Sequence, residues 1–452
     1  MSPDARYTAF NILVSWQNAS ATLDQILEQH DETVSLLSRK DRRLCNALVF
    51  GVLRQREAID WRIRAFSNAR LEKIRPKALY LLRMGIFQMA FMDRVPDFAA
   101  INSSVEIGKK ELGAKAAGFI NAVLRRAGRE YETIPLPDPD KDPVDFFAVR
   151  YALPRWLAHR WLIAYGREAL EPLCRQINSV PMLTVRTNTL KIDRPTLAEH
   201  LKDVARTVSL TPFSSLGVQI CGLDTQIHEL DAFGNGWFQV QDEAAQMVTE
   251  LLDPLPGETV LDACAGMGGK TGHIAQAMGN RGRVTAVDTD PAKLDRLAHE
   301  AQRLGIRIID TRTADIMKTT VKDFDHYFDR VLVDAPCTGL GVIRRNPDTK
   351  WKRTVADIQR MAGRQKKILN AGANLVRPGG ILVYAVCSCE PEENQGVIQA
   401  FLNKRKDFSI DKIDGSDTIC SLQTKDGFLR THPAPHDMDG FFAARLKRKL
   451  RQ

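Results

Sequence analysis

The sequence predicts a multidomain protein, in which an all-α N-terminal bundle precedes a small α+β module and a C-terminal α/β domain. Three observations predict this order. Apolar side chains recur at helical spacing throughout residues 5–128, four prolines fall within residues 135–143, and strand-like apolar runs alternate with helical stretches from about residue 236 onward. With 452 residues, the chain is long enough for two or three domains.

A basic helical bundle is expected over residues 1–134. Leu44, Leu48 and Val52 illustrate the helical spacing of its apolar side chains. Within it, residues 39–77 hold twelve Lys and Arg against four acids, so this segment alone carries a charge of +8, compared with +9 for the whole chain. Ordinary solvated helix faces can be basic too, but this degree of clustering favours a partner that carries phosphate groups, such as a nucleic acid.

A linker is predicted over residues 135–146, because four prolines within nine residues disfavour both a helix and a central strand. The next region, residues 147–235, is predicted to form a compact α+β module. Its expected helices cover residues 154–177 and 195–201, and its expected strands cover residues 182–187, 208–210 and 218–220.

A Rossmann-like α/β domain is predicted over residues 236–452. Strand, loop and helix repeat regularly there, which is typical of a parallel, doubly wound sheet. Ligands of such sheets bind at the carboxyl ends of the strands. The basic tail, residues 445–451, is expected to be a solvated end. The expected strands cover residues 259–263, 283–287, 306–311, 330–333 and 380–386.

Composition restricts the class of protein further. The chain is 44% hydrophobic and 26% charged, as is typical of soluble globular proteins. Its eight cysteines are spread along the chain without paired zinc-finger spacing, so we expect neither a disulfide framework nor a metal site. No charged-then-apolar leader opens the chain, and no apolar run approaches the ~20 residues that span a bilayer. We therefore expect a cytoplasmic protein with reduced thiols and no membrane partner.

A Gly-rich turn follows the first predicted strand of the α/β domain and leads into a helix. Its glycines let the backbone approach a ligand closely, and the helix N-terminus favours an anionic group. The spacing matches neither a Walker loop nor a strict Gly-x-Gly-x-x-Gly pattern. The residues expected to contact the ligand are Cys264, Ala265, Gly266, Met267, Gly268, Gly269 and Lys270.

Acidic residues follow three successive predicted strands at the same edge of the sheet. Asp288 could accept both ribose hydroxyls of a nucleoside cofactor, and Asp315 could accept the adenine amino group. Asp334 follows the next strand. Each acid alone could be a turn or cap residue, but three together favour an adenosine derivative with a small charged tail. S-adenosyl-L-methionine fits this description.

Two cysteine motifs follow neighbouring predicted strands at this edge. Cys337 ends the sequence Asp-Ala-Pro-Cys, and Cys387 begins the sequence Cys-Ser-Cys. Thiolate is the best protein nucleophile near neutral pH. C5 of a pyrimidine attacks a methyl sulfonium only after a thiolate has added to C6. If the ligand is a methyl donor, the thiols therefore indicate methylation of a pyrimidine at C5. An acid beside N3 and the exocyclic amine, such as Asp334, would hold a cytosine.

Several stretches resemble the RNA (cytosine-5) methyltransferases, and more closely their bacterial 16S ribosomal RNA branch of the Fmu/Sun type. Enzymes of this branch carry a NusB-like helical domain in front, and the resemblance covers essentially the whole chain. It implies an S-adenosylmethionine-dependent enzyme that makes 5-methylcytosine in 16S ribosomal RNA or a pre-subunit particle, as a monomer without a metal. The helical domain and the α+β module would bind RNA. The stretches are residues 118–126, 240–244, 262–270, 334–341, 344–351, 387–388, 391–394 and 439–442.

The resemblance also implies roles for individual residues. Cys387 matches the nucleophile that attacks C6, and Cys337 matches the cysteine that assists release of the methylated RNA. Asp334 would orient the cytosine, and the Gly-rich turn with the three acids would hold the cofactor. The sequence departs from the family pattern at Val386, where threonine is usual, and at Met267, where proline is usual. Neither departure removes an essential group.

Other interpretations remain open from the sequence. Cys337 could attack instead, as in DNA cytosine methyltransferases. The substrate could be a tRNA or another RNA, or the chain could be a non-catalytic NusB-like RNA-binding factor. Cys387 and Cys389 lie on one face of a strand and could be core residues, which we expect for Cys389 rather than Cys387. A zinc site formed by Cys264, Cys337, Cys387 and Cys389 is disfavoured by the cysteine spacing.

Overall fold

The computed structural model describes residues 4–223, 225–413 and 417–450. The chain forms two compact units. The first comprises Met1–Ser179 together with Ile343–Arg353, and the second comprises Val180–Val342 together with Thr354–Gln452. A short segment from the second half of the chain is therefore part of the N-terminal unit.

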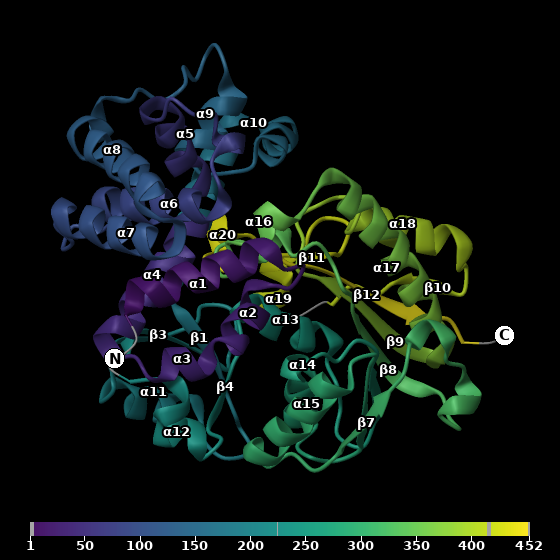
Figure 1. The fold of residues 1–452 in the computed structure, drawn as a ribbon. Coiled ribbons are helices and arrows are strands. Elements are labelled where there is room, and N and C mark those ends of the chain that lie inside the picture. Colours follow the sequence, from purple (N-terminus) through teal and green to yellow (C-terminus); the bar gives the residue numbers. More distant parts are fainter. Residues whose placement is uncertain (1–3, 224, 414–416, 451–452) are drawn as a thin grey trace. The chain divides into compact units, whose positions relative to one another are not determined.

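Every regular element in the described part of the first unit is a helix, which confirms the predicted all-α bundle (Figure 1). Helix α6 has buried residues on all of its sides. The guanidinium of its buried Arg83 donates two hydrogen bonds of 2.7 Å to the carboxylate of Asp60. A buried charge requires such a partner. The helices are α1 (Ala5–Asn18), α2 (Leu23–Gln29), α3 (Asp31–Ser35), α4 (Arg39–Arg54), α5 (Arg56–Phe66), α6 (Pro76–Phe91), α7 (Asp97–Leu112), α8 (Ala114–Glu130), α9 (Pro143–Arg150), α10 (Arg155–Asn178) and α16 (Thr349–Lys352).

The proline-rich stretch has two parts. Residues 135–142 contain neither a helix nor a strand, but Pro143 begins helix α9. Proline fits the first position of a helix because its missing N–H would have no partner there. The side chain of Asp142 accepts a hydrogen bond from the backbone N–H of Asp145 at 3.0 Å and caps the helix. A helix therefore begins inside the range predicted as a linker.

The segment Ile343–Arg353 packs within the helical unit through backbone acceptors. The ammonium of Lys352 donates to the carbonyl oxygens of Trp16, Ala19 and Ala21, at 2.6–3.1 Å. The indole N–H of Trp351 donates at 2.7 Å to the carbonyl oxygen at position 53. The indole of Trp351, within the 344–351 motif, and the ammonium of the next residue, Lys352, thus satisfy carbonyl groups in or near helix ends, which often lack partners there.

The α+β module of the second unit is built on an antiparallel sheet of order β2-β3-β1-β4. Its core contains Val185, Leu197, Val218 and Phe238. A module of the predicted kind is thus present, but its extent differs from the predicted residues 147–235. Helix α10, expected in the module, belongs to the helical unit, and β4, which was not predicted, lies beyond residue 235. The elements are β1 (Leu183–Thr187), α11 (Arg194–Lys202), β2 (Ala205–Leu210), β3 (Gly217–Leu223), α12 (Asp231–Gly234) and β4 (Phe238–Val240).

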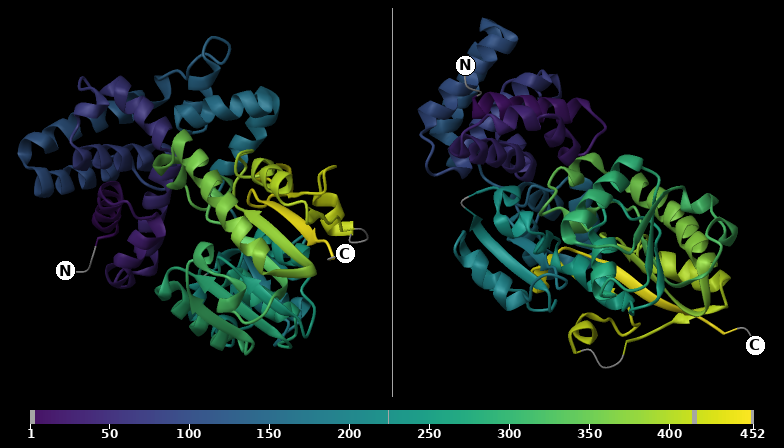
Figure 2. Two further views of the ribbon diagram at one scale, coloured as in Figure 1. Left: turned by 90° about the vertical axis from the view of Figure 1, so that its right-hand side faces the viewer. Right: turned by 90° about the horizontal axis from the view of Figure 1, so that it is seen from below.

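A larger sheet of order β10-β12-β9-β8-β5-β6-β7 forms the C-terminal α/β domain, and its strands β5 to β9 are parallel, as predicted. Figure 2 shows helices on both sides of this sheet. The elements are α13 (Glu243–Leu252), β5 (Thr259–Asp262), α14 (Gly269–Ala277), β6 (Arg283–Asp288), α15 (Pro291–Leu304), β7 (Ile309–Thr313), β8 (Phe328–Asp334), α17 (Val355–Leu375), β9 (Val376–Val386), α18 (Gln395–Lys404), β10 (Phe408–Ile410), α19 (Asp417–Leu422), β11 (Leu429–Arg430), α20 (Pro433–His436) and β12 (Phe442–Arg448).

The side chains of one strand show why two helical layers are needed. Val331 and Val333 of β8 pack into a core with α17 and α18, whereas Leu332 packs into a core with α13 and α14. Successive side chains of a strand point to opposite faces. A central strand that is apolar at every position must therefore be covered on both sides.

The prediction of a solvated basic tail was wrong. Residues 442–448 form β12, which lies antiparallel to β9 in the sheet. Arg445 donates to Asp411 and to the carbonyl oxygen at position 251, each at 2.8 Å, while Ala444 and Leu446 are buried. The charged residues concealed the alternating pattern of this strand. Arg451, included in the predicted tail, lies outside the described residues.

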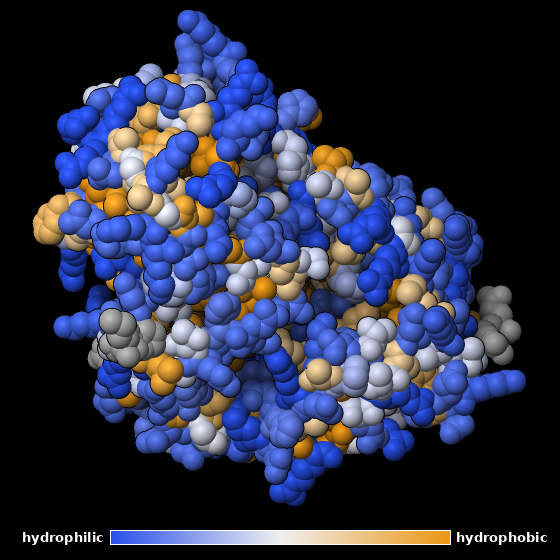
Figure 3. Space-filling view, viewed as in Figure 1, coloured by the Kyte–Doolittle hydropathy of each residue, from blue (hydrophilic) through white to orange (hydrophobic). Residues whose placement is uncertain are grey.

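The surface seen in Figure 3 is mostly hydrophilic, with apolar side chains gathered over the region of α6, α7 and α8. Exposed aromatic rings of these helices include Phe91 and Phe98. Among the described residues, no helix has both the length and the apolar character that crossing a bilayer requires.

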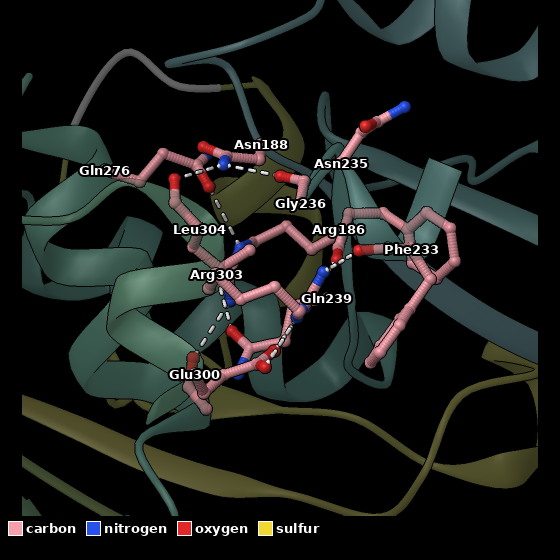
Figure 4. Close-up of polar contacts among 12 residues, drawn as sticks. Arg186, Asn188, Phe233, Asn235, Gly236, Gln239, Gln276, Glu300, Arg303 and Leu304 are labelled. Carbon is pink, nitrogen blue, oxygen red and sulfur yellow. Dashed lines mark hydrogen bonds and ion pairs between the residues drawn. The ribbon is translucent and has the colours of Figure 1, made fainter. Parts of the chain in front are cut away.

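A buried polar network joins the α+β module to the α/β domain within the second unit (Figure 4). The guanidinium of Arg186 on β1 donates to the side chains of Gln239, Gln241 and Gln276, and to the carbonyl oxygen of Gly269 at 2.9 Å. Burial lowers the pKa of Arg186 to about 9. Gly269 is the first residue of α14, so the module contacts the end of the Gly-rich turn directly.

A second contact of the same kind lies beside it. The side-chain amide of Asn188 donates to the carbonyl oxygens of Gly236 and Leu304, each at 2.8 Å, and so links the module to the end of α15. Arg303 of α15 lies over the ring of Phe233, 3.8 Å from its centroid. These interactions position the module against α14 and α15.

We expect Arg186→Met to destabilise the protein by about 3 kcal/mol or more, because it leaves several buried acceptors without a donor. Chemical denaturation followed by circular dichroism measures this loss. Arg281→Met, which removes an exposed guanidinium, is the control and should change stability by less than about 0.5 kcal/mol. Equal effects of the two substitutions would contradict the role assigned to the network.

Candidate functional site

A cavity of about 370 Å³ opens at the carboxyl ends of the parallel strands of the larger sheet. Its volume lies within the range of small-molecule sites, about 300–1,000 Å³. Its lining includes all three acids that the sequence analysis selected, Asp288, Asp315 and Asp334. The other lining residues are Ala263, Cys264, Gly266, Thr289, Lys293, Ala314, Ile316, Pro336, Arg364 and Ile368.

The Gly-rich turn between β5 and α14 forms one wall of the cavity. Gly266 has a φ of +55° and Gly268 a φ of +85°, which side chains with a Cβ rarely adopt. A Cβ at Gly268 would also lie 2.5 Å from the side chain of Leu297. The turn therefore depends on glycine at both positions.

The predicted residues of this turn divide into two groups. Cys264 and Gly266 line the cavity, whereas the five others do not. Ala265 packs into a small apolar cluster, and the side chain of Met267 is 57% exposed. The five residues outside the lining are Ala265, Met267, Gly268, Gly269 and Lys270.

The three acids differ in the hydrogen bonds that they already make. Asp288 accepts from the backbone N–H of Gly266 at 2.9 Å and of Asp290 at 3.0 Å. Asp315 accepts from the backbone N–H of Met317 at 3.0 Å and so caps a short 3₁₀ helix. A carboxylate has about four lone-pair positions, so both acids can accept further hydrogen bonds from a ligand.

Asp334 forms an ion pair with Lys270, whose Nζ lies 2.6 Å from its Oδ2 atom. Lys270 also lies over the ring of Phe441, 5.2 Å from the centroid. Burial opposes the charge on Lys270, but the carboxylate of Asp334 outweighs it and raises the pKa of the ammonium, with a further contribution from Cys387. A permanent cation therefore lies between the last lining acid and the second cysteine motif.

The sulfur atoms of Cys337 and Cys387 lie 3.1 Å apart. The two residues follow β8 and β9, which are neighbours in the sheet, so the structure brings the predicted thiols together. The hydrogen bond with Cys387, together with burial, raises the pKa of Cys337 well above 9.0. The raised pKa disfavours the thiolate form of Cys337.

Cys389 and Cys264 differ from this pair. Burial raises the pKa of Cys389 to about 12, and its sulfur lies 4.0 Å from Nδ1 of His432 and packs against Gly440. Burial also raises the pKa of Cys264. Within the described ranges, no group of three or more His, Cys, Asp or Glu side chains is arranged to hold a metal ion.

Sequence reasoning missed part of the lining. Pro336 lies in a motif that was recognised, but no role was assigned to it. Arg364 and Ile368 lie on α17. The sequence of a helix does not indicate which of its turns faces a cavity, because that depends on how the helix packs. Thr289 and Lys293 also line the cavity, and they lie only one and five positions after Asp288 in the sequence. This short separation in sequence was the signal that could have identified them.

Models of three protein families match this chain. Residues 3–129 match the NusB family. Residues 153–222 match the ferredoxin-like domain of RsmF/B-like methyltransferases, and residues 249–447 match the family described as 16S rRNA methyltransferase RsmB/F. The predicted N-terminal NusB-like bundle, α+β module and C-terminal methyltransferase fold are thus confirmed.

Curated relatives match over almost the full length. The probable ribosomal RNA small subunit methyltransferase B of Bacillus subtilis is 38% identical, over 91% of this chain and 92% of that protein. Its counterpart from Synechocystis is 34% identical, over 98% and 99%. The crystal structure of PH0851 has a TM-score of 0.82 at 26% identity and covers 99% of this chain and 100% of that one. A methyltransferase homolog protein from Pyrococcus horikoshii has a TM-score of 0.57 at 29% identity, with 67% and 97% covered.

We expect iodoacetamide to alkylate Cys337 slowly at pH values near 9.0, because the raised pKa leaves little thiolate there. Replacing Cys387 with alanine removes the main cause of the raised pKa, so Cys337 should then react faster at the same pH. Mass spectrometry of the alkylated peptides measures both rates. The exposed Cys221 and Cys420 serve as internal references. An unchanged rate at Cys337 would contradict the proposed hydrogen bond.

Proposed function

The chain belongs to the RsmB/F family of 16S rRNA methyltransferases, and on this premise we propose that it methylates C5 of a cytosine in 16S ribosomal RNA. The reaction would pass through a covalent bond between the sulfur of Cys387 and C6 of the base. The single observation that supports this chemistry best is the pair of thiols, 3.1 Å apart, at the ends of adjacent strands. Beside them, Asp334 and Pro336 line the cavity.

The cavity suits S-adenosylmethionine, which would supply an electrophilic methyl group. Asp288 offers free lone pairs to ribose hydroxyls, and Asp315 offers them to an adenine amino group. Gly266 would let the ligand approach the backbone. Asp334, which is paired with Lys270 outside the lining, would face the charged tail.

The same ion pair would select cytosine. Because Lys270 already donates to Asp334, the carboxylate remains a hydrogen-bond acceptor. An acceptor matches the exocyclic amine of cytosine, whereas uracil presents a carbonyl oxygen at that position. The base must be unpaired or flipped out, since stacking hides C6.

The hydrogen bond with Cys387 and burial raise the pKa of Cys337, which makes Cys337 the less suitable nucleophile and leaves that role to Cys387. Addition of the Cys387 sulfur, as a thiolate, to C6 places electron density on C5, which accepts the methyl group. A base, for which we propose a water molecule, then takes the C5 proton. The electron pair of that C–H bond re-forms the C5–C6 double bond and expels the sulfur of Cys387 as a thiolate, which accepts the proton of Cys337 from 3.1 Å away.

The RNA would be held largely outside this cavity. Within the basic segment 39–77, Arg54 is buried and Lys77 pairs with Glu111 at 2.8 Å, so not every cation is available to phosphates. We assign RNA binding to residues 1–134 and 147–235, as part of a monomer that acts on 16S rRNA or a pre-subunit particle. The exposed cations of the segment are Arg39, Lys40, Arg43, Arg64, Arg70, Lys73 and Arg75.

We expect Cys387→Ala to lower methyl transfer by about a thousandfold or more, because it removes the nucleophile. Cys337→Ala should retain addition to C6 but accumulate a covalent protein–RNA adduct, visible as a shifted band on a denaturing gel. Cys221→Ala, at an exposed position of the α+β module, is the control and should behave as wild type.

Two results would redirect this proposal. Full activity of Cys387→Ala would refute the assignment, and an adduct that forms in Cys387→Ala but not in Cys337→Ala would exchange the roles of the thiols. Bisulfite sequencing of total RNA from a deletion strain would identify the modified cytosine and distinguish ribosomal RNA from tRNA. Calorimetry with S-adenosylmethionine alone tests the non-catalytic alternative, which requires that no binding occurs.

A further inference from the structure

A buried carboxylate contacts the loops of both reactive cysteines. Glu393 is fully buried at the end of the second loop, just before α18. Its Oε2 atom accepts from the hydroxyls of Thr338 and Ser388, each at 2.5 Å. Its Oε1 atom accepts from the backbone N–H of Thr338 at 2.9 Å. Thr338 directly follows Cys337, and Ser388 directly follows Cys387, so one side chain links the residues next to both sulfurs.

Two further hydrogen bonds hold this carboxylate and its partners in place. The side-chain amide of Gln365 on α17 donates to Oε1 of Glu393 at 2.9 Å and to the carbonyl oxygen of Pro336 at 3.0 Å. The hydroxyl of Tyr384 on β9 donates to the backbone carbonyl of Glu393 at 2.6 Å. Both neighbours of Cys337 in the chain are therefore held by this group of hydrogen bonds.

The thiols lie beyond the ends of β8 and β9, where the ladder of backbone hydrogen bonds between the two strands no longer fixes the chain. Their separation of 3.1 Å therefore depends on how the two loops are held. Glu393 lies where the two loops meet, and all of its side-chain partners are buried.

A carboxylate is the side chain that this position requires. Four donors converge on it, and a carboxylate accepts at both oxygens. Glutamine would have nearly the same shape but only one acceptor oxygen, and its N–H₂ group would face other donors. The cost of burying a charge is offset by these charge-assisted hydrogen bonds.

We propose that Glu393 is a positioning residue that holds the Cys337 and Cys387 sulfurs at reacting distance by accepting hydrogen bonds from both cysteine loops at once. The inference rests on the proposed function, because it assumes that the two thiols act in turn on one base. After the hydrogen bond with Cys387 and burial, the charge of Glu393 also raises the pKa of Cys337. The same carboxylate therefore helps to keep the proton on the assisting thiol.

The test compares Glu393→Gln with Glu392→Gln in the full-length protein. Glu392 is the adjacent residue, is partly exposed, and accepts a hydrogen bond of 3.4 Å from Gln359. Three quantities are measured: kcat and KM for RNA methylation, the melting temperature, and bridging of the thiols by dibromobimane, a reagent that fluoresces after both of its ends have reacted. Mass spectrometry identifies the bridged peptides.

We expect Glu393→Gln to lower kcat between about ten- and a hundredfold, because misplacement by about 1 Å can cost about a hundredfold. The KM values for RNA and cofactor should stay within about twofold of wild type, since neither ligand contacts this residue in the proposal. Bridging of Cys337 to Cys387 should fall to the background of Cys387→Ala. The Glu392→Gln protein should match wild type in all three measurements.

The outcomes separate this inference from the proposed function. Normal bridging in a folded Glu393→Gln protein would overturn the positioning role, whatever its activity. Loss of bridging would support that role even if the RNA product proved to be other than 5-methylcytosine, because bridging does not depend on methylation. If Glu393→Gln fails to fold, Thr338→Val and Ser388→Ala replace it. Each removes one hydroxyl donor, and unchanged bridging in both would overturn the inference.

Discussion

The structure of the site depends on the convergence of two loops from adjacent parallel strands. β8 and β9 each end in a cysteine motif, and the sulfurs of Cys337 and Cys387 lie 3.1 Å apart. At this distance one thiol can donate its hydrogen to the other, and this hydrogen bond raises the pKa of Cys337. The two roles that we propose for the thiols depend on this contact. The contact requires that both loops be held rigidly, since a small displacement would break the hydrogen bond.

Rigidity around the site comes from buried polar groups rather than from apolar packing alone. Glu393 accepts from both cysteine loops, and Arg186 donates to the first residue of α14 at the end of the Gly-rich turn. Each group is satisfied by several partners, which is the condition under which a buried polar network orders a structure. The first network holds Pro336, which lines the cavity, and the second contacts the end of the Gly-rich turn, which forms one of its walls. Asp334, paired with Lys270, connects the cavity to the thiols.

The helical unit includes part of the chain that connects the first cysteine loop to α17. Residues Ile343–Arg353 pack among the N-terminal helices, where Lys352 and Trp351 donate to backbone carbonyls. The chain thus leaves the second unit six residues after Cys337 and returns at Thr354. Trp351 of the 344–351 motif therefore has a structural role, since its contact joins sequence-distant parts of the first unit.

Local sequence alone determined the elements that carry the site: the parallel strands β5 to β9, the Gly-rich turn, the three acids and both thiols. Strands and helices have characteristic apolar periods, and glycine and the residues at strand ends reflect local backbone preferences. These features can be interpreted from a single sequence. Only the tertiary structure decided that Lys270 pairs with Asp334, that Arg364 lines the cavity, and that the basic residues of β12 complete the sheet. Glu393 was visible within a motif, but its role was not. The physical reason is that these features depend on which buried donors and acceptors meet across long sequence separations, and no local pattern encodes that pairing.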